Sequence, residues 1–130
     1  MNFDVSTTLK KGKLPSLPFL RIKEKVLGKG YELSLVFVGK KRMRTLNRIY
    51  RQKDYATDIL SFPNTKDSGE IFICLEKVAI KAKDFERSTI DHVAFLFIHG
   101  LLHLKGRNHG TIMEREEQSY LQWLKKSQSA

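Results

Sequence analysis

The chain has 130 residues and a mass of 15.1 kDa, a length that predicts a single domain over residues 1–130. Hydrophobic residues make up 41% and charged residues 29%, which excludes an intrinsically disordered chain. The formal net charge is +10, and residues 1–53 hold 14 of the 24 Lys and Arg but only 3 of the 14 Asp and Glu. Such a one-sided charge favours a polyanionic partner, most simply a nucleic acid, over a membrane surface.

The start of the chain and its cysteine content favour a cytoplasmic protein. The first residues lack the apolar stretch and the small-residue cleavage site of a secretion signal. No apolar run reaches the length of about 18 to 20 residues that a spanning helix needs, so we expect no contact with a membrane. Cys74 is the only cysteine, and we therefore expect no disulfide, either within the chain or to a partner.

The first half of the chain predicts two strands and two basic helices. Residues 2–7 are a predicted strand, and residues 31–39 are a second one, rich in β-branched and aromatic residues. A basic helix over residues 16–27 lies between them, after the loop KKGKLP; its residues at helical spacing are Phe19, Leu20, Lys23, Val26 and Leu27. A short basic helix over residues 40–50 follows; its predicted face is Met43, Leu46, Ile49 and Tyr50.

The second half predicts a hairpin and three helices. The segments DILSFP and EIFICL read as strands joined by a polar turn at residues 64–69, with Pro63 ending the first strand or leaving it at an edge. A helix is predicted after them, because apolar residues recur at helical spacing: Leu75, Val78, Ala79, Ala82 and Phe85. The last helix is expected to begin with a Thr111–Glu114 capping box. It would cover the core with Tyr120, Leu121, Trp123 and Leu124.

Between these helices, residues 89–105 are apolar nearly all round, which predicts a helix buried on most sides. Ser88 and Asp91 form a capping pattern at its start, and Gly106 is placed to stop it. The element order is β α β α β β α α α. This order predicts an α+β fold with a small mixed sheet of about four strands, helices packed on it, and a central buried helix.

Three of the four histidines, His99, His103 and His109, fall on and just after this helix. His99 and His103 are four residues apart, so they project from one face, as two imidazoles that bind one metal ion do. Because Gly106 ends the helix, the chain can turn back and bring His109 to the same point. Three imidazoles without a fourth protein ligand describe an open site with water in the last position. We expect one zinc ion per chain, with nickel, copper or another divalent transition metal as alternatives.

Neighbouring residues receive ordinary structural roles. His92 lies two turns before His99, roughly 10 Å along the axis, too far to share its metal, so it is predicted to be a satisfied core or surface residue. Cys74 falls in an apolar strand, where a buried thiol is the usual occupant. Gly100 stands where the zinc-protease motif has its general-base Glu, and this disfavours peptide hydrolysis.

Three segments, in order from about Leu46 to His109, carry a family resemblance over about half of the chain. They are LNRIYRQKDYATDILSFP, GEIFIC and HGLLHLKGRNHG. They resemble the second block, the G-D-I-x-I-C strand and the H-G-x-L-H-L-x-G-x-D-H signature of the YbeY family of endoribonucleases, the ribosomal-RNA maturation factors. Glu70 and Asn108 stand where that family has Asp, and an amide at Asn108 would orient a metal ligand more weakly than a carboxylate.

The resemblance implies a metal-dependent, single-strand-specific endoribonuclease that matures ribosomal RNA, at the 16S 3′ end, and acts in ribosome quality control with the small ribosomal subunit as partner. It implies His99, His103 and His109 as metal ligands, and Arg51 as the functional arginine facing the metal. Arg51 and His99 would then be catalytic. A planar guanidinium can hold a phosphodiester at two points and stabilise charge that develops on it.

The basic segment around Arg51 is expected to track the RNA backbone with salt-sensitive binding. Its candidate contacts are Arg42, Arg44, Arg48, Arg51 and Lys53, and Tyr50 and Tyr55 are candidates to stack an unpaired base, although Tyr50 is equally suited to a core position. The nucleophile is left open between metal-activated water and the 2′-hydroxyl. Two alternative functions are an RNA-binding ribosome-assembly factor with a structural metal and little catalysis, and a metal hydrolase of small substrates.

Overall fold

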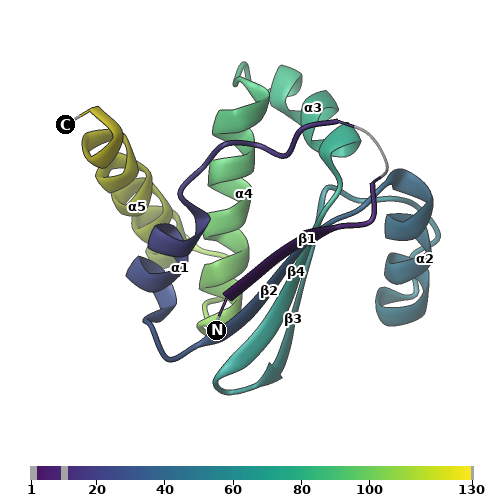
Figure 1. The fold of residues 1–130 in the computed structure, drawn as a ribbon, viewed down its shortest axis with the longest axis horizontal. Helices are drawn as coiled ribbons and strands as arrows, with labels where there is room; N and C mark the ends of the chain where they lie inside the picture. The colour runs from purple at the N-terminus through teal and green to yellow at the C-terminus, as the bar shows by residue number, and fades with distance from the viewer. Residues whose placement is uncertain (1–2, 10–11, 130) are drawn as a thin grey trace.

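The computed structural model describes residues 3–9 and 12–129 (Figure 1). Its elements are β1 (Phe3–Thr7), α1 (Phe19–Leu27), β2 (Glu32–Phe37), α2 (Lys40–Arg51), β3 (Ile59–Thr65), β4 (Ser68–Ile73), α3 (Leu75–Asp84), α4 (Thr89–Leu104) and α5 (Thr111–Ser129). This is the predicted order of strands and helices. Residue 2 of the predicted first strand, and Lys10 and Lys11 of the loop after it, lie outside the described residues.

The four strands form one mixed sheet in the order β1-β2-β4-β3, which confirms the predicted fold class. β2 pairs in parallel with β1 and with β4, whereas β3 and β4 form the predicted antiparallel hairpin. β3 is therefore an edge strand. Pro63 is tolerated within it because an edge strand does not need every N–H for the ladder.

Side chains of the strands alternate between two hydrophobic clusters on opposite faces of the sheet. One cluster joins the sheet to α1 and α4; its strand residues include Leu33, Leu35, Phe37, Ile71 and Ile73. The other cluster joins the sheet to α2; its members include Val38, Met43, Leu46, Leu60 and Cys74. In Figure 1, α2 accordingly lies across the sheet from α1, α4 and α5. The edge strand β3 lies between α2 and α4 and contacts both sides.

α4 is the central helix and is buried over most of its surface, as predicted. It packs against α1, α3, α5, β3 and β4. The Ser88 hydroxyl accepts a hydrogen bond from the Asp91 N–H at 3.1 Å, which confirms the predicted N-cap. No helix in the part of the chain that the structure describes is long and apolar enough to cross a bilayer.

The predicted faces of the two basic helices need correction. α1 begins at Phe19, because a residue that precedes a proline, here Leu17, disfavours helical dihedrals. Its buried face includes Ile22, whereas Leu20 is 45% exposed. In α2, Ile49 and Tyr50 are 57% and 58% exposed, so neither belongs to the core.

Buried positions can go to polar residues whose hydrogen bonds are satisfied, which apolar spacing does not reveal. Asn47 takes the buried position in α2 because its Nδ2 donates to the Tyr55 carbonyl at 2.9 Å. At the start of α5, the Glu114 N–H donates to the Gly110 carbonyl at 3.0 Å, so Gly110 holds the N-cap position that was predicted for Thr111. Phe85 ends α3 as its C-cap and is 60% exposed, not part of the predicted buried face.

Candidate functional site

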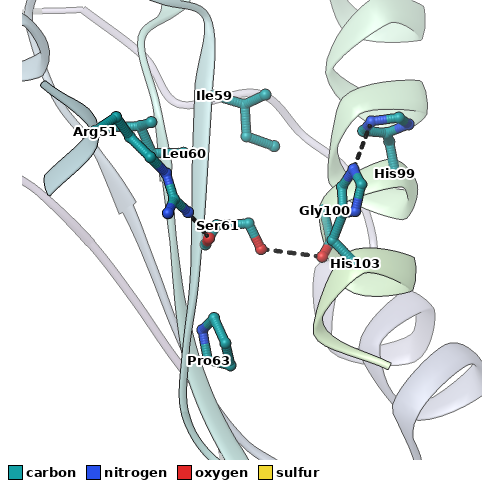
Figure 2. A pocket seen from close by; sticks show the side chains of 8 residues that line it. All are labelled: Arg51, Ile59, Leu60, Ser61, Pro63, His99, Gly100 and His103. Carbon is teal, nitrogen blue, oxygen red and sulfur yellow. Dashed lines mark hydrogen bonds between the residues drawn. The ribbon is translucent and has the colours of Figure 1, made fainter. Parts of the chain in front are cut away.

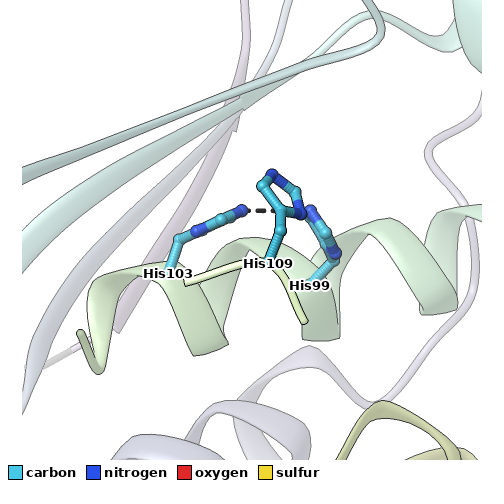
Figure 3. A group of neighbouring side chains, drawn as sticks. All are labelled: His99, His103 and His109. Carbon is cyan, nitrogen blue, oxygen red and sulfur yellow. Dashed lines mark hydrogen bonds between the residues drawn. The ribbon is translucent and has the colours of Figure 1, made fainter. Parts of the chain in front are cut away.

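The three histidines of the predicted site converge beside the C-terminal half of α4 (Figure 3). Each offers one ring nitrogen, and these three nitrogens lie within 4.8 Å of one another. The Nε2 atoms of His99 and His103 are 3.1 Å apart. The ring centre of His109 lies 5.2 Å from that of His99 and 4.7 Å from that of His103. The prediction that these residues meet at one point is confirmed.

A tight turn after α4 brings His109 back toward the helix. Gly106 has a φ of 96°, a left-handed conformation that glycine adopts without a steric penalty. Its N–H donates to the His103 carbonyl, and the Arg107 N–H donates to the Leu102 carbonyl, both at 3.0 Å. These two bonds are the Schellman motif that commonly ends a helix. The predicted stop at Gly106 therefore also builds the site.

The two helical histidines have their Nδ1 atoms engaged by neighbouring oxygens. His99 Nδ1 lies 2.6 Å from Oε1 of Glu117 on α5, and His103 Nδ1 lies 3.2 Å from the Arg107 carbonyl oxygen. A carbonyl or carboxylate oxygen accepts, so each Nδ1 carries a proton. When both rings are in the neutral form that a metal requires, the two facing Nε2 atoms present lone pairs to the same point.

A metal ion bound between the two Nε2 atoms would accept both lone pairs. Tetrahedral zinc with Zn–N bonds of about 2.0–2.1 Å places its ligand nitrogens about 3.3 Å apart. The separation of 3.1 Å between the Nε2 atoms of His99 and His103 is close to that value. Burial, with a smaller effect of His99, lowers the pKa of His103, which favours the neutral ring that a metal needs. The donor set therefore fits a metal ion.

Glu117 is the site residue that sequence reasoning missed. Its side chain is buried, with the residue only 5% exposed, between the buried residues Met113 and Leu124 of the same helix. The signal was a carboxylate at helical spacing within the apolar face of α5, because a buried acid needs a partner. Asn108 is exposed, and the carboxylate that orients a histidine is Glu117 on the next helix.

A cavity of about 390 Å³ lies beside the histidines, next to the edge strand β3 (Figure 2). It is lined by Arg51, Ile59, Leu60, Ser61, Pro63, His99, Gly100 and His103. Ser61 connects its two sides: the hydroxyl donates to the Gly100 carbonyl of α4 at 3.1 Å, and the carbonyl accepts from Nη2 of Arg51 at 2.9 Å. The cavity therefore brings together the end of α2 and the face of α4 that carries the histidines.

Arg51 is the last residue of α2, and its side chain reaches the edge strand β3, where it lines this cavity. Its guanidinium carbon lies 4.7 Å from the centre of the Phe62 ring, in a cation–π contact. One Nη is engaged by the Ser61 carbonyl, and a guanidinium has further N–H groups that can bind an anion in the cavity.

Comparison with known proteins identifies the family. A family model described as Endoribonuclease YbeY matches residues 7–126. The Endoribonuclease YbeY of Phytoplasma australiense is 40% identical over 100 residues, which cover 70% of this chain and 69% of the relative. That of Carboxydothermus hydrogenoformans is 40% identical over 107 residues, or 75% of each chain. The chain belongs to the endoribonuclease YbeY family.

The similarity to other YbeY proteins is partial in length. The Alkaliphilus metalliredigens Endoribonuclease YbeY is 41% identical over 98 residues, 67% of this chain and 63% of the relative. The chain thus matches about two thirds to three quarters of the length of these curated relatives. The solution structure of TM1509 from Thermotoga maritima shares the fold, with a TM-score of 0.69 and 23% identity over 98% of this chain and 91% of that one.

The other predicted RNA-contacting residues of this YbeY chain lie outside the cavity lining. Arg44 forms a two-point ion pair with Asp54, with 2.8 Å from Nε to Oδ1 and 3.0 Å from Nη2 to Oδ2. Hydrogen bonding to Arg44 lowers the pKa of Asp54, so the pair stays charged at neutral pH. Arg48 and Lys53 are exposed on the same segment. Of the predicted basic residues, the structure brings only Arg51 to the cavity.

His92 and Cys74 are both buried, as predicted for structural residues, although the buried Nε2 atom of His92 has no hydrogen-bond partner among the described residues. His92 is 1% exposed; its ring stacks with those of Phe85 and Phe95, and its Nδ1 accepts from Nη1 of Arg87 at 3.2 Å. Cys74 is fully buried in the cluster against α2, and burial raises the pKa of its thiol. Among the described residues, neither belongs to the group that could hold a metal.

The packing of α4 explains the glycine at position 100. A Cβ there would lie 3.1 Å from the Cδ1 atoms of Ile59 and Ile71, closer than most real contacts. A larger residue at this position would therefore require the side chains of Ile59 and Ile71 to shift by a few tenths of an ångström.

Proposed function

We propose that this chain is a metal-dependent endoribonuclease that cleaves single-stranded RNA and acts in ribosomal RNA processing. The observation that carries the proposal is the shared cavity, in which Arg51 faces the same space as His99 and His103. Membership of the YbeY family supports an RNA-cleaving hydrolase. The net charge of +10, concentrated in residues 1–53, supports a polyanionic substrate.

The proposed metal ligands are His99, His103 and His109, with zinc as the first candidate and nickel as an alternative. When bound, the ion supplies a Lewis acid that polarises a phosphate oxygen and lowers the pKa of a water molecule. Glu117 keeps the Nδ1 proton on His99, and the Arg107 carbonyl keeps it on His103, so both Nε2 atoms point toward the shared position. His109 completes the set from the turn after α4.

Arg51 is the proposed phosphate-binding residue. The Ser61 carbonyl and the Phe62 ring hold its guanidinium at the edge of the cavity. From there it can donate two hydrogen bonds to a phosphodiester and stabilise the negative charge that develops in the transition state. The ends of the products distinguish the two nucleophiles, because attack by the 2′-hydroxyl leaves a cyclic phosphate.

The proposed substrate is ribosomal RNA of the small subunit, toward the 3′ end of the 16S molecule, and the proposed location is the cytoplasm. A role in ribosome quality control belongs to the same proposal. The support is the family membership together with the one-sided charge of the chain. Incubation of purified protein with precursor small subunits, with sequencing of the new RNA ends, tests the substrate.

Arg51→Ala is the decisive variant for the chemistry. We expect kcat for a single-stranded RNA to fall by about 100-fold or more, because a donor to the transition state is lost, while metal content and melting temperature stay unchanged. Arg48→Ala is the matched control: this arginine is exposed on the same helix, one turn earlier, outside the cavity lining. It should raise KM only.

Two results would contradict the proposal. One is an equal loss of kcat in Arg51→Ala and Arg48→Ala. The other is a fully metal-loaded wild type that binds single-stranded RNA without cleaving it, which would instead indicate an RNA-binding assembly factor with a structural metal.

A further inference from the structure

The C-terminal end of α2 exposes aromatic surface in the middle of its basic residues. Tyr50 is 58% exposed, although it lies between Ile49 and Arg51 on a helix that packs against the sheet. Arg48 and Lys53, its neighbours along the chain, are also exposed. An exposed aromatic ring in a basic segment is a combination with which proteins bind single-stranded nucleic acid.

The ring of Tyr50 is held in place although it is exposed. Its centre lies 5.2 Å from that of Phe62, with 54° between the ring planes. Phe62 is half-buried and is itself packed edge-on against Phe72, at 6.0 Å, in the cluster between the sheet and α2. Tyr50, Phe62 and Phe72 thus form an aromatic row. Contact with Phe62 limits the motion of the Tyr50 ring and leaves part of that ring open to solvent.

The same aromatic row contacts the proposed phosphate-binding arginine. The Arg51 guanidinium lies 4.7 Å from the centre of the Phe62 ring. Ser61 and Pro63, the chain neighbours of Phe62 in β3, line the cavity together with His99 and His103. Tyr50 is thus separated from the cavity by one ring and one guanidinium, on the α2 side of the edge strand.

We propose that Tyr50, supported by Phe62, is a specificity-determining residue that stacks one unpaired nucleobase of the RNA substrate next to the phosphate held by Arg51. The proposal rests on the proposed function. A base paired in a duplex has both faces covered by its neighbours, so only an unstacked base can lie on Tyr50. The contact favours single strands and is tolerant of sequence, because every base has an aromatic face.

Tyr55 provides a matched control on the same segment. It is 53% exposed, close to the exposure of Tyr50. Within the described part of the chain, however, it belongs neither to the cavity lining nor to the ring contacts with Phe62. A general effect of aromatic residues near basic ones would make the two tyrosines equivalent, whereas the proposed contact makes only Tyr50 important.

The test measures binding to two strands by fluorescence anisotropy, with full-length, metal-loaded protein. One is a mixed-sequence 2′-O-methyl phosphorothioate oligonucleotide, which resists cleavage, and the other is the same backbone with every base removed. Tyr50→Ala should bind the complete strand about tenfold more weakly and the abasic strand as the wild type does. Tyr50→Phe should restore binding, Tyr55→Ala should change it less than about twofold, and Arg48→Ala should weaken both strands alike.

The abasic strand and the control variants make the proposal falsifiable. Equal losses for Tyr50→Ala on the complete and the abasic strand would overturn it, as would equal losses for Tyr50→Ala and Tyr55→Ala. A measurement on wild type alone avoids any folding defect: photo-crosslinking of single-stranded RNA that contains 5-iodouridine should join it to Tyr50, and crosslinks to Tyr55 without Tyr50 would overturn the proposal. A wild type that binds but never cleaves RNA would refute the proposed function separately.

Discussion

The histidine side and the basic side of the cavity are built in different ways. The histidine side comprises His99, His103, His109 and Glu117; two of its imidazoles project from the buried helix α4, and each of these has its second nitrogen in a hydrogen bond. The basic side comprises Arg42, Arg48, Arg51 and Lys53, all of them exposed at or near the surface of α2. Its one residue at the cavity, Arg51, is held by a carbonyl and a ring.

This difference follows from what each side has to bind. A metal ion requires donor atoms within a few tenths of an ångström of their ideal positions, which a buried helix and oriented imidazoles provide. A flexible polyanion needs positive charge along its path but little fixed geometry, so exposed and hydrated side chains suffice. The exception is Arg51, which the proposed chemistry requires in one place and which is accordingly anchored to β3.

The strongest test of this contrast is removal of one imidazole from the histidine side. His103→Ala should reduce the metal content from about one ion per chain to almost none, because two imidazoles remain for an ion that needs three protein ligands. Elemental analysis of the purified protein measures it. His92→Phe is the control, since His92 is a buried histidine of the same helix outside the metal group. Unchanged metal content in His103→Ala would refute the ligand set.

Glu117→Gln should have the next largest effect. The amide can still accept from His99 Nδ1 but without charge, so we expect metal affinity to fall by about 10- to 100-fold while the ligands remain. Competition with a chromophoric chelator measures the change. Glu116→Gln is the control, because that neighbouring carboxylate pairs with Arg107 and not with a histidine. Equal losses in the two variants would show that Glu117 has no specific role in orienting His99.

The smallest effect is expected from substitutions on the basic side, which should change the salt dependence of RNA binding. Replacing Arg42 and Arg48 together by Gln should reduce the slope of log Kd against log salt by about 1.4, or about 0.7 for each phosphate that the protein no longer neutralises, with metal content unchanged. Adding Arg44→Gln should change the slope little further, because Asp54 already neutralises Arg44. If Arg44→Gln lowered the salt slope as much as Arg42→Gln or Arg48→Gln does, the ion pair with Asp54 would not neutralise Arg44.

Much of the histidine site could be predicted because it depends on local geometry. Four residues of helix place His99 and His103 on one face, whatever surrounds them, and a glycine at the helix end predicts the reversal that returns His109. The strand order was harder to predict. The polar turn predicted the hairpin, and Pro63 predicted either the end of its first strand or an edge position, of which the structure shows the second. These predictions rely on contacts between residues close in sequence.

The buried faces of the basic helices were harder to predict. The spacing of apolar residues does not show where a polar side chain is buried with its hydrogen bonds satisfied. Asn47 is buried in α2 through its bond to the Tyr55 carbonyl, while Tyr50 stays largely exposed although its ring contacts Phe62. A similar limit applies to Glu117: its spacing places it on the apolar face of α5, but the sequence does not show that His99 is its partner.

By itself, the amino-acid sequence determined the family, the order of elements, the uneven charge and the three histidines that meet at the end of α4. The family resemblance implied that Arg51 faces the metal, but only the tertiary structure decided that Ser61 and Phe62 hold it at the cavity, that Glu117 holds His99, and that Tyr50 lies open beside them. The physical reason is that these three contacts join α2, β3, α4 and α5, segments far apart along the chain. Their meeting depends on how the whole core packs, which local spacing does not encode.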